Sequence, residues 1–169
     1  MFKTNNPHLL HREAVDLVIK NLPGAVSVDS IVSSDLKSGK GLPYHIDWNG
    51  LKLLVRIARP SVKKRTAKWQ SSQTKRWYFS LRDEDHKIAD FFILFCLTDS
   101  EIIGVYAIPR VFSARSLITI SRIDGNMRYD YFRTDVQNLH TKIMEVKNSL
   151  PKLVKIYREV EGLRRNKNE

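Results

Sequence analysis

The chain has 169 residues, of which 42% are hydrophobic and 9% aromatic, so it can bury the core of one folded domain and does not resemble a disordered protein. Its 29 Lys and Arg outnumber its 18 Asp and Glu, which gives a net charge of +11. Such an excess favours a polyanionic partner, most commonly nucleic acid, although a generically basic protein has the same composition.

Signals for a membrane or for secretion are missing from the sequence. The longest apolar run, ADFFILFCL, has nine residues, whereas a bilayer-spanning helix needs about 20. The first residues, MFKTNNPHLLHRE, lack the apolar stretch of a secretory signal. The single cysteine, Cys96, lies inside the apolar run, which excludes an internal disulfide and predicts a buried, unreactive thiol. We therefore expect a soluble, cytoplasmic protein with no membrane partner.

Hydrophobic periodicity predicts a helix, then a series of strands, then two helices. The strongest local signal is Asn49-Gly50, because both residues tolerate the positive φ of a two-residue hairpin turn. Pro151 suits the first turn of the second C-terminal helix. The expected elements are a helix at 9–22, strands at 25–32, 76–81, 91–97, 101–109 and 116–122, a hairpin at 44–60, a charged turn at 82–87, and helices within 134–165. This order predicts an α/β fold with a mixed central sheet flanked by helices, in a single domain over residues 1–169.

A segment without any acid, residues 59–76, follows the hairpin, and we call it the basic segment. Trp69 lies inside it and Trp77 directly after it. Its seven cations are Arg59, Lys63, Lys64, Arg65, Lys68, Lys75 and Arg76. Cations placed in this way can contact phosphates, and the indole of Trp69 can stack on an unpaired base. We expect Trp77, within a strand, to lie in the core; the alternative for the basic segment is a solvated surface loop.

Several stretches together resemble the PD-(D/E)XK, or restriction-endonuclease-like, superfamily, and within it the small resolvase-like and homing-endonuclease-like members. They are the helix bearing Glu13, the hairpin YHIDWNGLKLLVRIARP, and the strands RWYFSL, IADFFILFCL and GVYAIP. The resemblance covers approximately residues 9–133, and it implies a nuclease core that acts on DNA with Mg²⁺. The C-terminal helices, 134–165, lie outside it. Asp47 would take the place of the first metal-binding acid, joined by Glu13 from the preceding helix.

The return strand of the hairpin departs from the family pattern. The resemblance calls for an acid and a lysine two residues apart, where this chain has Leu54 and Arg56. Leucine cannot bind a metal, and arginine is a poor base although it can hold a phosphate. Alternatively, a migrated site could hold Mg²⁺ on Glu13 and Asp47, with Lys52 or Arg56 as the cation. We therefore predict a catalytically degenerate, cofactor-free nucleic-acid-binding protein, expected to bind DNA, with an active Mg²⁺-dependent endonuclease as the alternative.

Each candidate also has a structural explanation. Glu13 could be a solvent-facing helix residue, and Arg56 could simply pair with Asp47. Asp47 itself could accept backbone N–H groups near the turn. Asp90, before the strand at 91–97, is expected to be structural.

The five histidines have no metal-ligand spacing, and His8 and His11 at the first helix are expected to be ordinary surface residues. A third class of function is protein interaction, including a homodimer formed through the C-terminal helices. In that case the positive charge would be incidental.

Overall fold

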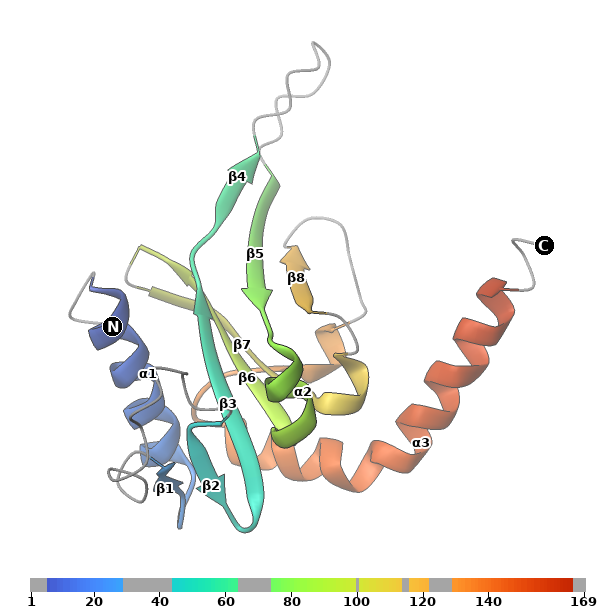
Figure 1. Cartoon of the computed structure of the whole chain (residues 1–169), viewed down its shortest axis with the longest axis horizontal. Helices are drawn as coiled ribbons and strands as arrows, with labels where there is room; N and C mark the ends of the chain where they lie inside the picture. Colours follow the sequence, from blue (N-terminus) through green and yellow to red (C-terminus); the bar gives the residue numbers. More distant parts are fainter. Residues whose placement is uncertain are drawn as a thin grey trace.

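The computed structural model describes residues 6–28, 44–63, 74–99, 101–113, 116–121 and 129–165. Within these ranges the chain forms α-helices, two β-sheets and two short 3-10 helices (Figure 1). The elements are α1 (Pro7–Asn21), β1 (Val26–Ser27), β2 (Ile46–Trp48), β3 (Leu51–Ala58), β4 (Ser61–Lys63), β5 (Thr74–Ser80), α2 (Asp83–Ile88), β6 (Phe91–Thr98), β7 (Glu101–Pro109), η3 (Arg110–Phe112), β8 (Leu117–Ser121), η4 (Asp130–Phe132), β9 (Arg133–Thr134) and α3 (Leu139–Arg165).

The larger sheet has the strand order β1-β2-β3-β6-β7-β9. Strands β3 and β6 are parallel and the other neighbours are antiparallel, so the predicted mixed sheet in an α/β fold is confirmed. Strand β6 lies inside the sheet, and its residues 91–97 are all buried. This burial agrees with its uninterrupted apolar sequence, which is typical of a strand covered on both faces.

Helices cover both faces of this sheet. His86 of α2 contacts Phe92, with 5.5 Å between ring centroids, and His140 of α3 contacts Trp48, with 5.3 Å between centroids. Strand register puts Phe92 on the same face as Leu54, and Trp48 on the opposite face. Helices α2 and α3 therefore pack on opposite sides of the sheet.

The hairpin formed by β2 and β3 is the one predicted around Asn49-Gly50. Both turn residues have positive φ, 50° at Asn49 and 75° at Gly50. In the ladder Asp47 lies directly across from Lys52. The hairpin prediction is confirmed, including the backbone conformation that the two turn residues were expected to adopt.

A second sheet, β4-β5-β8, continues from the first because β3 leads into β4 through Arg59 and Pro60. Figure 1 shows β4 and β5 extending away from the large sheet, and we call this pair of strands the arm. Trp77 of β5 is buried and its Nε1 donates to the Leu97 carbonyl at 2.8 Å, so its predicted place in the core is confirmed.

Two expectations about helices are wrong. The stretch at 82–87 was expected to be a charged turn, but Asp83–Ile88 form α2, whose acids lie in the first turn, where a helix dipole favours negative charge. The C-terminal region was expected to hold two helices, but α3 is a single helix that runs through Pro151. Proline removes one helical hydrogen bond and can bend a helix without ending it. Figure 1 shows α3 changing direction along its length.

The remaining boundaries shift slightly. Strand β9 and a turn precede α3, so the helix begins at Leu139 rather than near Thr134. Of the strand expected at 25–32, only Val26–Ser27 form one in the described part, and residues from 29 onward lie outside it. None of the helices within the described ranges has both the length and the apolar character that crossing a membrane requires.

Candidate functional site

The edge of β3 beyond the hairpin is completed by two histidine side chains. Strand β2 pairs with β3 only as far as Leu53, so the backbone of Val55 projects past the ladder. The Val55 N–H donates to Nδ1 of His45 at 3.1 Å, and Nε2 of His11 donates to the Val55 carbonyl at 3.2 Å. The two rings meet edge to face, with 4.4 Å between centroids. These histidines satisfy backbone groups that a longer β2 would have paired.

The hydrogen bonds assign the ring protons. Nδ1 of His45 accepts an N–H, so the proton of its neutral ring lies on Nε2. The Val55 carbonyl can only accept, so His11 carries a proton on Nε2. The expectation that His11 is an ordinary surface residue is wrong, because its ring is part of this packing.

A charged cluster lies beside the histidines, on the face of the sheet covered by α2. Asp85 of α2 has a fully buried side chain, and its carboxylate accepts from Arg56 at 2.9 Å and from Arg82 at 3.0 Å. The backbone N–H of Arg82 donates to the same carboxylate at 2.9 Å. Burial alone would raise the pKa of Asp85, but the hydrogen bonds from Arg82 and the charge of Arg56 lower it below the ordinary value. Arg56 therefore pairs with Asp85, and the suggested pairing with Asp47 is wrong.

The environment of His45 keeps this ring neutral. Burial lowers the pKa of His45 to about 3, and electrostatic interactions with His11 and Arg56 act in the same direction. Burial also lowers the pKa of Arg56, an effect that Asp85 partly offsets. A guanidinium remains charged throughout the physiological range, so the cluster consists of two cations and one anion beside a neutral imidazole.

Replacing His45 with asparagine should flatten the pH dependence of stability. Between pH 6.5 and about 3 the unfolded chain binds a proton that the folded chain does not, so stability falls as pH drops through this window. From pH 7 to pH 5 the wild-type protein should lose about 2 kcal/mol through this residue. In His45→Asn, the side-chain oxygen can accept from Val55 N–H but has no titrating proton. Urea unfolding at pH 7 and pH 5 measures the difference, and an equal loss in both proteins would contradict the buried neutral ring.

Asp47 and Lys52 lie across from each other at the closed end of the hairpin. Oδ1 of Asp47 accepts from the Gly50 N–H at 3.3 Å, so the turn-stabilising alternative for Asp47 is confirmed. Nζ of Lys52 lies 5.5 Å from the centroid of the Tyr44 ring, a cation–π contact. Both side chains therefore already take part in local interactions of the hairpin.

Two positions of the return strand, 54 and 56, do not fit the Mg²⁺ that the resemblance implies. Leu54 is fully buried among apolar side chains, and Arg56 brings a cation to the same face. Mg²⁺ requires oxygen ligands, and neither side chain supplies one. Among the described residues, no group of three or more His, Cys, Asp or Glu side chains is arranged to hold a metal ion.

His11 of α1 contacts the hairpin through its hydrogen bond to the Val55 carbonyl. Glu13 is half-buried on the same helix, two residues further on, and two residues correspond to about 200° of helical rotation. Glu13 and His11 thus project from different sides of α1.

Asp90 is structural, as expected: it accepts from the Lys52 N–H at 2.9 Å and donates its own N–H to the Lys52 carbonyl at 2.7 Å.

Only part of the basic segment falls within the described residues. Arg59 is exposed where β3 leads into the arm. On β5, Arg76 lies opposite Ser61 in the strand register, and Lys75 lies opposite Val62 of β4. Lys63 lies on β4, opposite Thr74. The predicted contacts at Lys64, Arg65, Lys68 and Trp69 lie outside the described residues.

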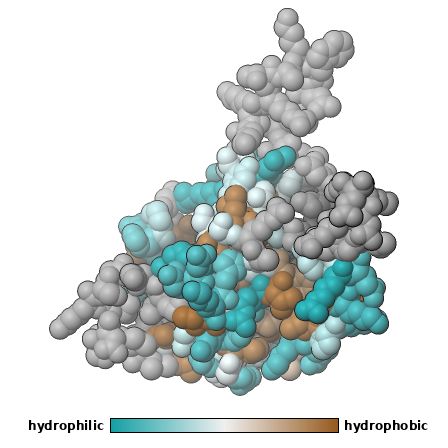
Figure 2. Space-filling view, turned by 45° about the vertical axis from the view of Figure 1, so that its right-hand side comes forward, coloured by the Kyte–Doolittle hydropathy of each residue, from teal (hydrophilic) through white to brown (hydrophobic). Residues whose placement is uncertain are grey.

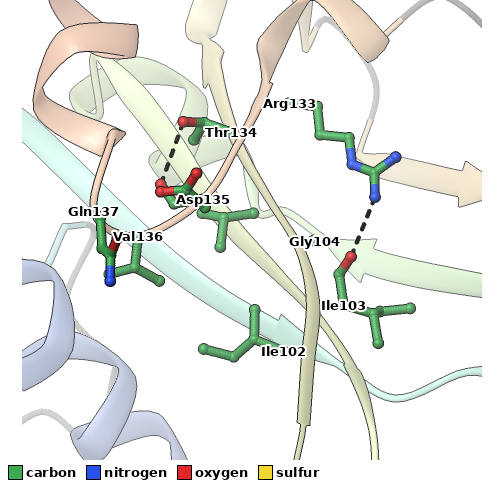
Figure 3. A pocket seen from close by; sticks show the side chains of 9 residues that line it. Ile102, Ile103, Gly104, Arg133, Thr134, Asp135, Val136 and Gln137 are labelled. Carbon is green, nitrogen blue, oxygen red and sulfur yellow. Dashed lines mark hydrogen bonds between the residues drawn. The ribbon is translucent and has the colours of Figure 1, made fainter.

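A pocket of about 470 Å³ lies at the far edge of the large sheet, between β7 and the turn before α3 (Figure 3). Arg133 reaches across it to donate to the Ile103 carbonyl at 3.3 Å. Asp135 accepts from the backbone and side-chain N–H groups of Asn138 at 2.8 and 2.7 Å, which lowers the pKa of Asp135. None of the candidates predicted from sequence is among its lining residues. The charges in this pocket order β9 and the start of α3.

The surface in Figure 2 is largely hydrophilic, with small hydrophobic patches between hydrophilic side chains. Exposed large apolar side chains in the described ranges are Leu9, Val26, Val111, Leu117, Tyr131, Met144, Ile156 and Val160. The thiol of Cys96 is buried, as predicted, and burial raises its pKa to about 12.

We call the two histidines and the charged cluster beside β3 the hairpin site. Four of its residues were not predicted from the sequence: His11, His45, Arg82 and Asp85. A signal for Asp85 was present, because acids at 83–85 followed by His86 and Lys87 match the charge order of a helix start. The histidines had no comparable signal, since their role depends on where β2 stops.

Comparison of the chain with protein-family models, with curated proteins and with solved structures finds no match. The resemblance to PD-(D/E)XK nucleases thus remains an expectation, and proposals about function depend on the residues and geometry described above.

Proposed function

We propose that this protein binds nucleic acid, with DNA as the expected partner, on a nuclease-like scaffold and without cleaving it. The observation that carries the proposal is the position of the basic segment, which starts where β3 enters the arm and ends on β5. Its seven cations are more than half of the net charge of +11, and no acid interrupts them.

The arm is a suitable support for contacts with phosphates. It extends away from the large sheet (Figure 1). On β5, Lys75 and Arg76 are adjacent and therefore point to opposite faces. Cations spread along such an arm neutralise successive phosphates and release their counterions.

The altered hairpin supports binding without cleavage. The position where the family pattern has a second acid is the buried Leu54, and Arg56 is paired with Asp85. A guanidinium in this place can orient a phosphate, but it cannot remove a proton from an attacking water.

Binding and cleavage can be measured together. With labelled DNA or RNA and Mg²⁺ or Mn²⁺, we expect retarded complexes without shorter products, and a steep loss of affinity as salt rises. Lys75→Gln should lower the slope of log affinity against log salt by about 0.9, the value for one phosphate contact. Lys155→Gln, which removes an exposed charge from α3, is the matched control and should leave the slope unchanged.

Three outcomes would replace this proposal. Absent or salt-insensitive binding would make the charge incidental, and size-exclusion chromatography would then show whether the protein self-associates. Equal slopes for Lys75→Gln and Lys155→Gln would exclude a contact by the arm at Lys75. Cleavage that is lost in Glu13→Ala and in Asp47→Ala would favour an active Mg²⁺-dependent endonuclease.

A further inference from the structure

The small sheet β4-β5-β8 has one buried face and one face toward solvent. On the buried face, Trp77 and Phe79 of β5 and Ile118 and Ile120 of β8 are at most 6% exposed. The residues between them along each strand point the other way, because side chains alternate between the two faces of a sheet. We call this second face the outer face, and its described side chains are Ser61, Arg76, Tyr78, Ser80, Leu117, Thr119 and Ser121.

The outer face carries an aromatic ring at its centre. Tyr78 lies on β5, the central strand of the small sheet, directly opposite Thr119 of β8. Tyr78 is partly exposed, and within the described part of the chain its side chain takes part in no hydrogen bond, ion pair or ring contact. Leu117, two residues from Thr119 on the same face, is 45% exposed. The ring and the leucine together offer a contact surface for a flat apolar group.

The sequence around this sheet favours an anionic partner. The strands of the small sheet lie within two segments, 59–82 and 102–123, and neither contains an Asp or a Glu. The first segment includes the seven cations of the basic segment, and the second adds Arg110, Arg115 and Arg122. All 18 acids of the chain lie outside these two segments. A polyanion therefore has the charge that complements this part of the protein.

An unpaired strand suits the outer face better than a duplex does. Inside a duplex the faces of the bases are covered by the neighbouring base pairs, and proteins contact the base edges in the grooves or the phosphates. In an unpaired strand a base can turn its face to an aromatic side chain. Hydroxyl groups such as those of Ser80 and Thr119 can at the same time donate to phosphate oxygens.

We propose that the outer face binds an unpaired nucleic-acid strand, with one base stacked on Tyr78 and the strand's backbone against the hydroxyls of Ser80 and Thr119. The proposal rests on nucleic-acid binding by the arm and names the class of nucleic acid that is bound. Because β5 belongs both to the arm and to the small sheet, one strand can contact the outer face and the basic segment together.

The test measures the affinity of the full chain for a labelled single-stranded DNA, and for the same DNA annealed to its complement, by fluorescence anisotropy. We expect Tyr78→Ala to weaken binding of the single strand about five- to hundredfold, the range for one lost base–aromatic stack, and to leave binding of the duplex unchanged. The slope of log affinity against log salt should stay the same, because no phosphate contact is lost. Tyr78→Phe keeps the ring and should bind like the wild type.

Two further variants separate stacking from other effects. Tyr78→Leu keeps an apolar side chain without an aromatic ring and should lose most of the same affinity. Thermal unfolding verifies that this variant and Tyr78→Ala are folded. Tyr131→Ala removes an exposed tyrosine on η4, outside the small sheet, and should leave both affinities unchanged.

The other outcomes separate this proposal from the more general one. An equal loss for single strand and duplex in Tyr78→Ala, or no loss for either, overturns the outer face as a site for unpaired strands and leaves nucleic-acid binding intact. If Tyr78→Phe loses as much affinity as Tyr78→Ala, stacking is also overturned, because the hydroxyl is then the group that matters. Failure of the wild-type protein to bind either form of DNA overturns the proposed function itself.

Discussion

Replacing Asp85 with alanine is expected to lower the free energy of unfolding by about 3–5 kcal/mol, the usual result of removing one partner of a buried ion pair. The Asp85 side chain is 0% exposed and that of its partner Arg56 is 23% exposed, so the arginine would be left largely buried without a counter-charge. The change also removes the acceptor of the Arg82 N–H, which begins α2. Urea unfolding at pH 7 measures the loss.

Glu84 provides the matched control for Asp85, because it precedes it on α2, carries the same charge and is exposed. Glu84→Ala should change the free energy of unfolding by no more than about 0.5 kcal/mol. Asp85→Asn keeps an oxygen acceptor but not the charge, and should fall between the two. An equal, small effect of Asp85→Ala and Glu84→Ala would show that the cluster does not hold α2 on the sheet.

Local sequence patterns predicted the elements whose structure depends on neighbours along the chain. The turn at Asn49-Gly50 needs positive φ, and these residues tolerate it in any context. The run at 91–97 is apolar on both faces, which indicated a strand covered by two layers before any partner was known. The α/β fold class follows from these strong local signals.

The hairpin site was less predictable because its contacts join residues far apart in the sequence. Asp85 lies 29 residues from Arg56, and His11 lies 44 residues from Val55. Nothing in the sequence around His45 indicates that β2 will extend no further than the neighbouring Ile46. The backbone N–H of Val55 is then left without a strand partner and is hydrogen-bonded by the His45 side chain instead. The sequence showed which residues depart from the nuclease pattern, whereas only the structure shows what their neighbours do.

The residues around Leu54 and Arg56 explain why these two departures from the nuclease pattern occur together. In a metal site, carboxylates gather around a divalent cation and their repulsion is relieved by it. Here the permanent cation is Arg56, and a single carboxylate, Asp85, is enough to pair with it. The adjacent imidazole of His45 is neutral because burial and the nearby positive charges lower its pKa. Leu54 packs in the core beside this ion pair and has no oxygen to offer a metal ion.

Replacing Leu54 with glutamate restores the type of residue that the nuclease pattern has at this position, and it is expected to destabilise the protein severely. Leu54 is 0% exposed on β3, with Phe92 of β6 beside it in register. Leu→Ala at a buried site costs about 2–5 kcal/mol, and an ionised carboxylate adds a desolvation penalty unless a cation pairs with it. We expect Leu54→Glu to lose at least about 4 kcal/mol of unfolding free energy, or not to fold at all.

Leu54→Met is the control for this experiment, because it conserves volume and should cost less than about 1.5 kcal/mol. The informative comparison is thermal unfolding of Leu54→Glu with and without Mn²⁺. A ligand that binds only the folded state raises its melting temperature, so a metal site at the hairpin would partly rescue this variant and not Leu54→Met. Because Asp85 already neutralises Arg56 and Asp47 holds the turn, we expect no rescue. A stable Leu54→Glu whose melting temperature rises with Mn²⁺ would mean that the hairpin is still a metal centre lacking one ligand, and the case for binding without cleavage would have to be abandoned.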